Sequence, residues 1–143
     1  APIRFGENGK GIQSRWYAGT IARRIRDIFR VSDRIEFVQC DGMAIIGKHS
    51  RKKRVAFFVD PPYTAAGKRA GNRLYTHHAL NHELLFAVIG KVSGDFLMTY
   101  DNDDQLVAMA DRHEFESRTI AMKNTHHAVM NELLIGRDLS WVK

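Results

Sequence analysis

The sequence predicts an α/β fold with a sheet of about five strands and helices on its faces. The first observation is an uninterrupted apolar run at 55–59, which basic residues precede and prolines follow. This run is too short for a helix and is typical of a strand buried on both faces of a parallel sheet. The second observation is a pair of apolar stripes with helical spacing, at 17–28 and 84–92, on either side of that strand in the chain.

The amino-terminal part is predicted to run from loop to helix to strand. Residues 1–14 should be loop, because they hold three Gly and one Pro without periodicity. Residues 14–30 should form an amphipathic helix that packs on the sheet by its apolar stripe, with its arginines in solvent, and this is favoured over a helix that reads DNA. Residues 34–39 read as a strand that ends at Cys40-Asp41-Gly42, where the lone Cys40 should be a small buried packing residue.

The carboxyl-terminal part alternates between helix and strand patterns. A helix from about residue 80 should end at Ser93-Gly94. A strand at 95–100 and a helix at 103–113 follow it. The last two strands are expected at 117–123 and 131–136.

Composition sets further bounds. A chain of 143 residues with 44% hydrophobic and 27% charged residues is predicted to be a single globular domain, 1–143. No apolar run is long enough to span a membrane and no secretory signal is recognisable, so a cytoplasmic location without a membrane partner is expected. Residues 1–54 hold 13 Lys and Arg against 5 acids, which suits a polyanion such as DNA. The basic run at 51–54 is equally typical of a solvated loop.

The turn after the apolar strand has a composition that suits one substrate group. Asp60 should lie at the carboxyl end of the strand, where ligands of open α/β sheets bind. Pro61 and Pro62 stiffen the turn and leave carbonyl oxygens available as acceptors. Together with the ring of Tyr63, these groups suit an aromatic amine, because Asp60 and the Pro61 carbonyl can accept both amino hydrogens. The alternative is a purely structural turn that ends a strand.

The tetrapeptide Asp60-Pro61-Pro62-Tyr63 resembles the catalytic motif of the Dam-like S-adenosylmethionine-dependent DNA adenine-N6 methyltransferases, which flip the target base out of the duplex. The resemblance implies a partial Rossmann-like methyltransferase sheet, mostly parallel, with a terminal antiparallel strand pair. It makes all four residues of the motif catalytic. It also implies that Asp41 and Asp60 contact the cofactor, S-adenosylmethionine.

The same resemblance assigns parts of the chain to DNA contact. Residues 1–14 resemble the end of the family's target-recognition region, and residues 15–143 resemble the carboxyl-terminal part of its catalytic domain. The polar loop at 64–75 is expected to lie over the site. The candidate DNA-binding residues, three from the amino-terminal segment and three from this loop, are Arg4, Lys10, Arg15, Lys68, Arg69 and Arg73.

The Gly-rich turn that holds the methionine end of the cofactor in this family is missing from the sequence. The glycines at 6–11 have a similar spacing but lack the preceding strand that such a turn requires. The chain is therefore expected to be a fragment, a decayed remnant, or one piece of a split enzyme whose second chain carries the amino-terminal cofactor half. The rival interpretation is a non-catalytic nucleic-acid-binding or assembly module. His78 and His82 have a metal-compatible spacing, but exposed or capping histidines are the favoured interpretation.

Overall fold

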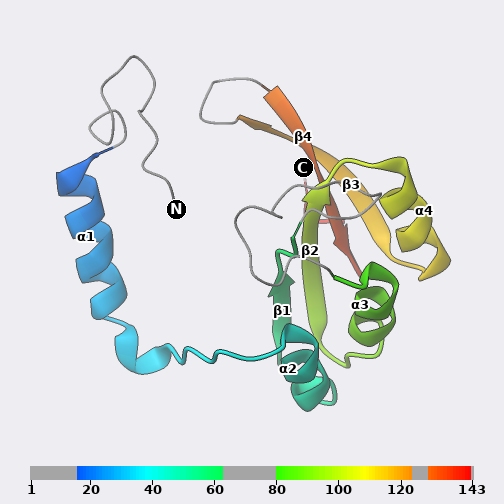
Figure 1. Ribbon diagram of the computed structural model, residues 1–143, viewed down its shortest axis with the longest axis horizontal. Helices are drawn as coiled ribbons and strands as arrows, with labels where there is room; N and C mark the ends of the chain where they lie inside the picture. The colour runs from blue at the N-terminus through cyan, green and yellow to red at the C-terminus, as the bar shows by residue number, and fades with distance from the viewer. Residues whose placement is uncertain (1–15, 63–79, 124–128, 143) are drawn as a thin grey trace. The chain divides into compact units, whose positions relative to one another are not determined.

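A computed structural model describes residues 16–62, 80–123 and 129–142 of the chain (Figure 1). The chain divides into two compact units, residues 1–39 and residues 40–143, and each is described by itself. No helix within the described ranges is long and apolar enough to cross a membrane.

The first unit contains the helix α1, Ala18–Phe29, and a short 3-10 turn, Ser32–Arg34. The predicted amphipathic helix is confirmed, although none of its side chains is buried. The predicted strand at 34–39 is wrong, because residues 35–39 are extended but pair with no strand of the described chain. Phe37 is 88% exposed, so the apolar side chains of this stretch face solvent instead of a sheet. Cys40, which follows it, is exposed rather than buried.

The second unit contains a four-stranded mixed sheet in the order β1-β2-β4-β3. Its strands are β1 (Ala56–Val59), β2 (Asp95–Asp101), β3 (Glu116–Lys123) and β4 (Val129–Gly136). β1 pairs with β2 in parallel, whereas β4 pairs antiparallel with both β2 and β3. The predicted α/β class and the terminal antiparallel pair are thus confirmed. Within the described residues the sheet has four strands instead of the expected five or so, and one of its three strand pairings is parallel instead of most of them.

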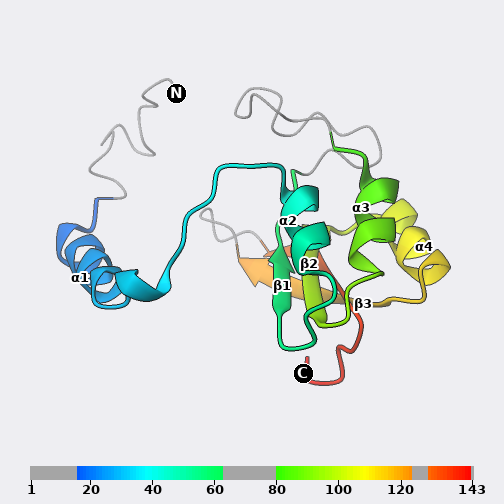
Figure 2. The same cartoon turned by 90° about the horizontal axis from the view of Figure 1, so that it is seen from below.

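Three helices of the second unit bury their apolar sides in one core. They are α2 (Gly42–His49), α3 (His82–Ile89) and α4 (Asp104–Arg112). In this core, residues of the helices pack against alternate side chains of β2 and β4. The helical residues are Ile46, Leu85, Phe86, Ile89, Leu106 and Ala110. Because alternate residues of a strand point to the same face, the three helices pack on one face of the sheet. In Figure 2, α2 and α3 run opposite to β1 and β2, so their amino termini lie toward the carboxyl ends of these strands.

The predicted helices at 80–92 and 103–113 are confirmed as α3 and α4. Each begins at a side-chain cap: Asn81 accepts from the backbone N–H of Leu84, and Asp103 accepts from that of Gln105. The helix α2 was not expected, because Asp41-Gly42 reads equally well as a turn after a strand. Asp41 is in fact the amino-terminal cap of this helix.

The strand β1 lies at the edge of the described sheet, whereas the sequence predicted a central strand buried on both faces. Phe57 and Val59 face the core, but Phe58 points to the other face and is 69% exposed. The expectation was wrong on position because only β2 pairs with β1 among the described strands. Within the described residues, β1 therefore buries apolar side chains on one face only.

Candidate functional site

The carboxyl edge of the parallel pair β1 and β2 carries the predicted motif. Val59 of β1 pairs with Met98 of β2. The residues that follow them, Asp60 and Thr99, therefore lie side by side. The Thr99 hydroxyl donates a hydrogen bond of 2.9 Å to Oδ1 of Asp60. Asp60 itself is exposed.

The two prolines after Asp60 pack the turn against the rest of the second unit. Pro61 is buried and Pro62 is half-buried. Because proline fixes its own φ and the ring of Pro61 is enclosed, the carboxylate of Asp60 sits on a stiff support. Tyr63, the fourth residue of the motif, lies outside the described residues.

Asp41 caps the amino terminus of α2, which lies toward the carboxyl end of β1 (Figure 2). Its Oδ1 atom accepts from the backbone N–H of Met43 at 2.7 Å and of Ala44 at 3.3 Å. The prediction that a strand delivers Asp41 to this edge is wrong, because a helix cap holds it there. Its role toward the cofactor stays a prediction.

A partly buried polar pair, which sequence reasoning missed, lies next to the motif on the core side of the sheet. Tyr100, the residue after Thr99, is fully buried, and its hydroxyl lies 3.1 Å from Nδ1 of His82 at the start of α3. The two rings meet edge to face at 5.6 Å. Burial raises the pKa of the Tyr100 hydroxyl and lowers the pKa of His82. The pair fixes the amino terminus of α3 to the carboxyl end of β2.

No sequence signal could have found the His82–Tyr100 pair, because the two residues are 18 positions apart and meet only through the packing of α3 on β2. His82 had been considered with His78 as a metal pair, but His78 lies outside the described residues. Within the described ranges, no group of three side chains is arranged to hold a metal ion.

The basic residues fall into two groups with respect to the structure. The candidate DNA contacts all lie outside the described residues and are Arg4, Lys10, Arg15, Lys68, Arg69 and Arg73. The run at 51–54 is exposed and precedes β1, so it lies at the amino end of that strand, whereas Asp60 lies at the carboxyl end. A strand of four residues spans about 13 Å, which separates this run from the motif.

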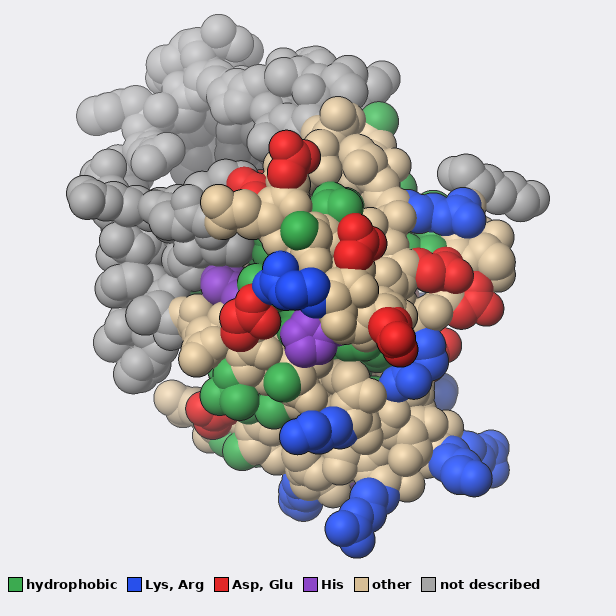
Figure 3. All heavy atoms as spheres, turned by 90° about the vertical axis from the view of Figure 1, so that its right-hand side faces the viewer, with side chains coloured by type: hydrophobic (Ala, Val, Ile, Leu, Met, Phe, Trp, Pro, Cys, Tyr) green, Lys and Arg blue, Asp and Glu red, His purple; other side chains and the backbone are tan. Residues whose placement is uncertain are grey.

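The face formed by α3 and α4 carries acidic, basic and histidine side chains close together (Figure 3). Glu83 pairs with Arg112, and its other carboxylate oxygen lies 3.6 Å from Nε2 of His113. All of these groups are at least partly solvated, so each ion pair contributes little to stability. A face of mixed sign has no strong attraction for a polyanion.

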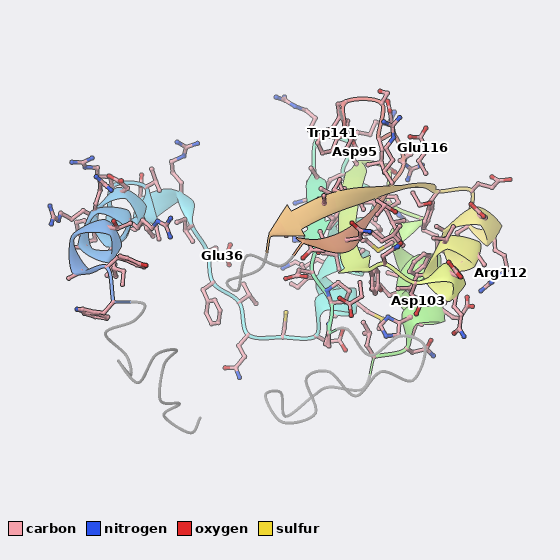
Figure 4. All side chains as sticks on the ribbon, turned by 90° about the horizontal axis from the view of Figure 1, so that it is seen from above. Glu36, Asp95, Asp103, Arg112, Glu116 and Trp141 are labelled. Atoms are coloured by element: carbon pink, nitrogen blue, oxygen red, sulfur yellow. The ribbon has the colours of Figure 1, made fainter. Side chains whose placement is uncertain are left out.

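A shallow depression of about 440 Å³ opens near the carboxyl end of α3, lined among others by Lys91, His113 and Arg137. It is remote from the motif, because Lys91 shortly precedes the start of β2, whereas the motif lies beside the end of that strand. In Figure 4, Asp95 marks the start of β2, and Asp103, the cap of α4, follows shortly after its end. The depression is therefore not part of the candidate site.

No protein-family model matches the sequence, and no curated protein matches it.

Proposed function

We propose that this chain is part of an S-adenosylmethionine-dependent DNA methyltransferase that methylates the exocyclic amino group of adenine. The observation that carries the proposal is the position of Asp60-Pro61-Pro62 directly after β1, at the carboxyl edge of a parallel strand pair. Ligands of open α/β sheets bind at that edge. The antiparallel pair of β3 and β4 gives further support, because the resemblance implies such a pair at the end of the sheet.

The chain's own groups have the chemistry that an adenine amine requires. The amine is a poor nucleophile because its lone pair is delocalised into the ring. The Asp60 carboxylate and the Pro61 carbonyl accept its two hydrogens and localise the lone pair, while Tyr63 stacks on the flipped base. In a direct, in-line transfer these groups would hold the amine while it gains the methyl group and gives up one proton. The cofactor supplies the methyl group as a sulfonium with a neutral thioether leaving group.

The residues present fit the cofactor only in part. Asp41 and Asp60 are the proposed contacts and both lie toward the carboxyl end of β1, but Asp41 caps a helix on the core face of the sheet, whereas Asp60 bonds to Thr99 on the opposite face. In addition, Oδ1 of Asp41 is already bound to the helix α2. No apolar strand leading into a Gly-rich turn occurs in the 143 residues. A second chain, or a further segment, would then hold the methionine end. Calorimetry should accordingly find weak or no binding of S-adenosylmethionine by this chain alone, and tight binding would contradict that expectation.

Asp60→Ala tests the proposed chemistry. The assay is methyl incorporation into adenine-containing duplexes, with a cofactor-binding half supplied in trans or fused. Because the carboxylate acts mainly in the transition state, the rate should fall by about 100-fold or more while DNA affinity changes little. Asp95→Ala, at the opposite end of β2, is the matched control and should retain activity.

Two outcomes would overturn the assignment. Full activity in Asp60→Ala would show that Asp60-Pro61-Pro62-Tyr63 is not the catalytic turn. If the unmutated assembled protein never methylates, the non-catalytic nucleic-acid-binding or assembly module takes the place of the enzyme. Tyr63→Ala and Tyr63→Phe refine the result: loss of stacking should cost about 1–3 kcal/mol in capture of the base, whereas Phe keeps the ring.

Binding to DNA is tested separately by its dependence on salt. If Arg4, Lys10 and Arg15 contact phosphates, affinity should fall steeply as salt rises, because each neutralised phosphate releases condensed counterions. Reversing the charge of these three should weaken binding more than reversing Arg112 and Arg118, which lie in the part of the chain without net positive charge. Binding that is independent of salt would contradict a phosphate interface.

A further inference from the structure

The contact between Asp60 and Thr99 joins two strands at the candidate site. The parallel register of β1 and β2 brings the residues together although they are 39 positions apart in the chain. The hydroxyl is the donor and the carboxylate oxygen Oδ1 is the acceptor, at 2.9 Å. Hydrogen bonds to an ionised acceptor are stronger than those between neutral groups. This bond therefore limits rotation of the Asp60 side chain.

Thr99 is itself held in a fixed orientation. It is half-buried in the middle of the sheet, with β1 on one side and β4 on the other. Its cross-strand partner on β4 is the buried residue Leu134. Two heavy atoms on Cβ restrict χ1 of threonine, and packing in a strand restricts it further. The hydroxyl is thus presented to Asp60 by a rigid element rather than by a loop.

We infer that Thr99 is a positioning residue: its hydroxyl orients the carboxylate of Asp60 toward the amine to be methylated. The inference rests on the proposed function for the identity of the substrate, but the positioning itself is a property of this chain. Thr99 acts through Asp60 and is not expected to touch the base or the cofactor.

Three variants separate this role from general effects on the sheet. Thr99→Val has the same shape without the hydroxyl, and Thr99→Ser keeps the hydroxyl without the methyl group. Thr119→Val is the matched control, because Thr119 also lies in a strand and its hydroxyl contacts Asn102 Oδ1 at 3.4 Å, away from Asp60. Unfolding curves establish first that each variant is folded.

The first measurement uses the isolated chain and does not depend on methyl transfer. Three-bond NMR couplings from the backbone N and C′ atoms to Cγ of Asp60 report the population of its χ1 rotamers. The unmutated chain, Thr99→Ser and Thr119→Val should show one dominant rotamer, whereas Thr99→Val should show averaged couplings. Unchanged couplings in Thr99→Val would overturn the inference, as would averaging in Thr99→Ser. If Thr99→Val does not fold, Thr99→Ser alone decides by keeping or losing the single rotamer.

The second measurement uses the assembled enzyme of the proposed function. Thr99→Val should lower kcat for methyl transfer about tenfold, or ~1.4 kcal/mol, with little change in KM, and Thr99→Ser should restore most of it. An equal effect of Thr119→Val would show a structural role and overturn the inference. If the unmutated enzyme proves inactive, the proposed function fails, while the rotamer measurement still decides whether Thr99 positions Asp60.

Discussion

Removing one buried hydroxyl should measurably weaken the carboxyl edge of the sheet. Tyr100→Phe keeps the aromatic ring, which packs against Phe86 at 6.1 Å and against the ring of His82, but removes the group 3.1 Å from Nδ1 of His82. A neutral hydrogen bond contributes about 1 kcal/mol net, and a half-buried partner that loses it costs more, so we expect a loss of roughly 1–2 kcal/mol. For a unit of about 100 residues, this lowers Tm by roughly 5–12 °C.

The assay is urea unfolding at pH 7.5, followed by far-UV circular dichroism and tryptophan fluorescence. Tyr17→Phe is the matched control, because Tyr17 is 68% exposed and its hydroxyl should contribute less than about 0.5 kcal/mol. A Tyr100→Phe variant as stable as the unmutated chain would refute the reasoning. That result would mean that the contact of the hydroxyl with His82 in the folded state is no more favourable than its hydrogen bonds to water in the unfolded state.

Three further changes have defined outcomes. Burial lowers the pKa of His82 below 6.5, so the folded chain binds this proton less readily than the unfolded chain does. The free energy of unfolding should therefore fall as the pH drops below 6.5. Unfolding curves of His82→Gln should show a smaller fall over the same pH range. Gly94→Ala would place a Cβ 2.0 Å from the carbonyl oxygen of Val55, so it should lower the free energy of unfolding in urea by about 2 kcal/mol or more. Gly19→Ala in α1 brings its Cβ within 4 Å of no atom other than those of its chain neighbours and its own helix backbone, and should raise the free energy of unfolding by roughly 0.5–1 kcal/mol. Asp41→Ala should cost about 1 kcal/mol through loss of the α2 cap, and Asp41→Asn should keep most of it.

The elements that the sequence predicts correctly are those whose signals are local. The helices α3 and α4 each combine an apolar stripe with a capping residue, Asn81 or Asp103, within a single stretch. The strands β2, β3 and β4 likewise follow from short β-rich runs between turns. By contrast, residues 35–39 have a strand-like pattern but no partner strand among the described residues, and pattern alone cannot supply the partner.

The candidate site divides along the same line. Asp60 could be placed at the end of a strand because the strand, the acid and the prolines are contiguous. Thr99 could not be linked to it, because the contact depends on the register of two strands and joins residues 39 positions apart in the chain. The pairing of His82 with Tyr100 was hidden for the same reason. Prediction from sequence thus placed Asp60 at the end of its strand and missed two contacts that depend on how the elements pack, Thr99–Asp60 and His82–Tyr100.

The mismatch at β1 bears on how the proposed enzyme is assembled. A strand with no polar residue between Ala56 and Val59 is typical of a position with neighbours on both sides and layers on both faces. In the described chain β1 has one neighbouring strand, and Phe58 stands in solvent on the face that the helices of the second unit leave open. An apolar edge strand is a ready site for pairing with another strand. A further strand beside β1 would reconcile its composition with its position. A second chain or segment that carried the cofactor turn on such a strand would place it beside Asp60, which is what the proposed methyl transfer requires.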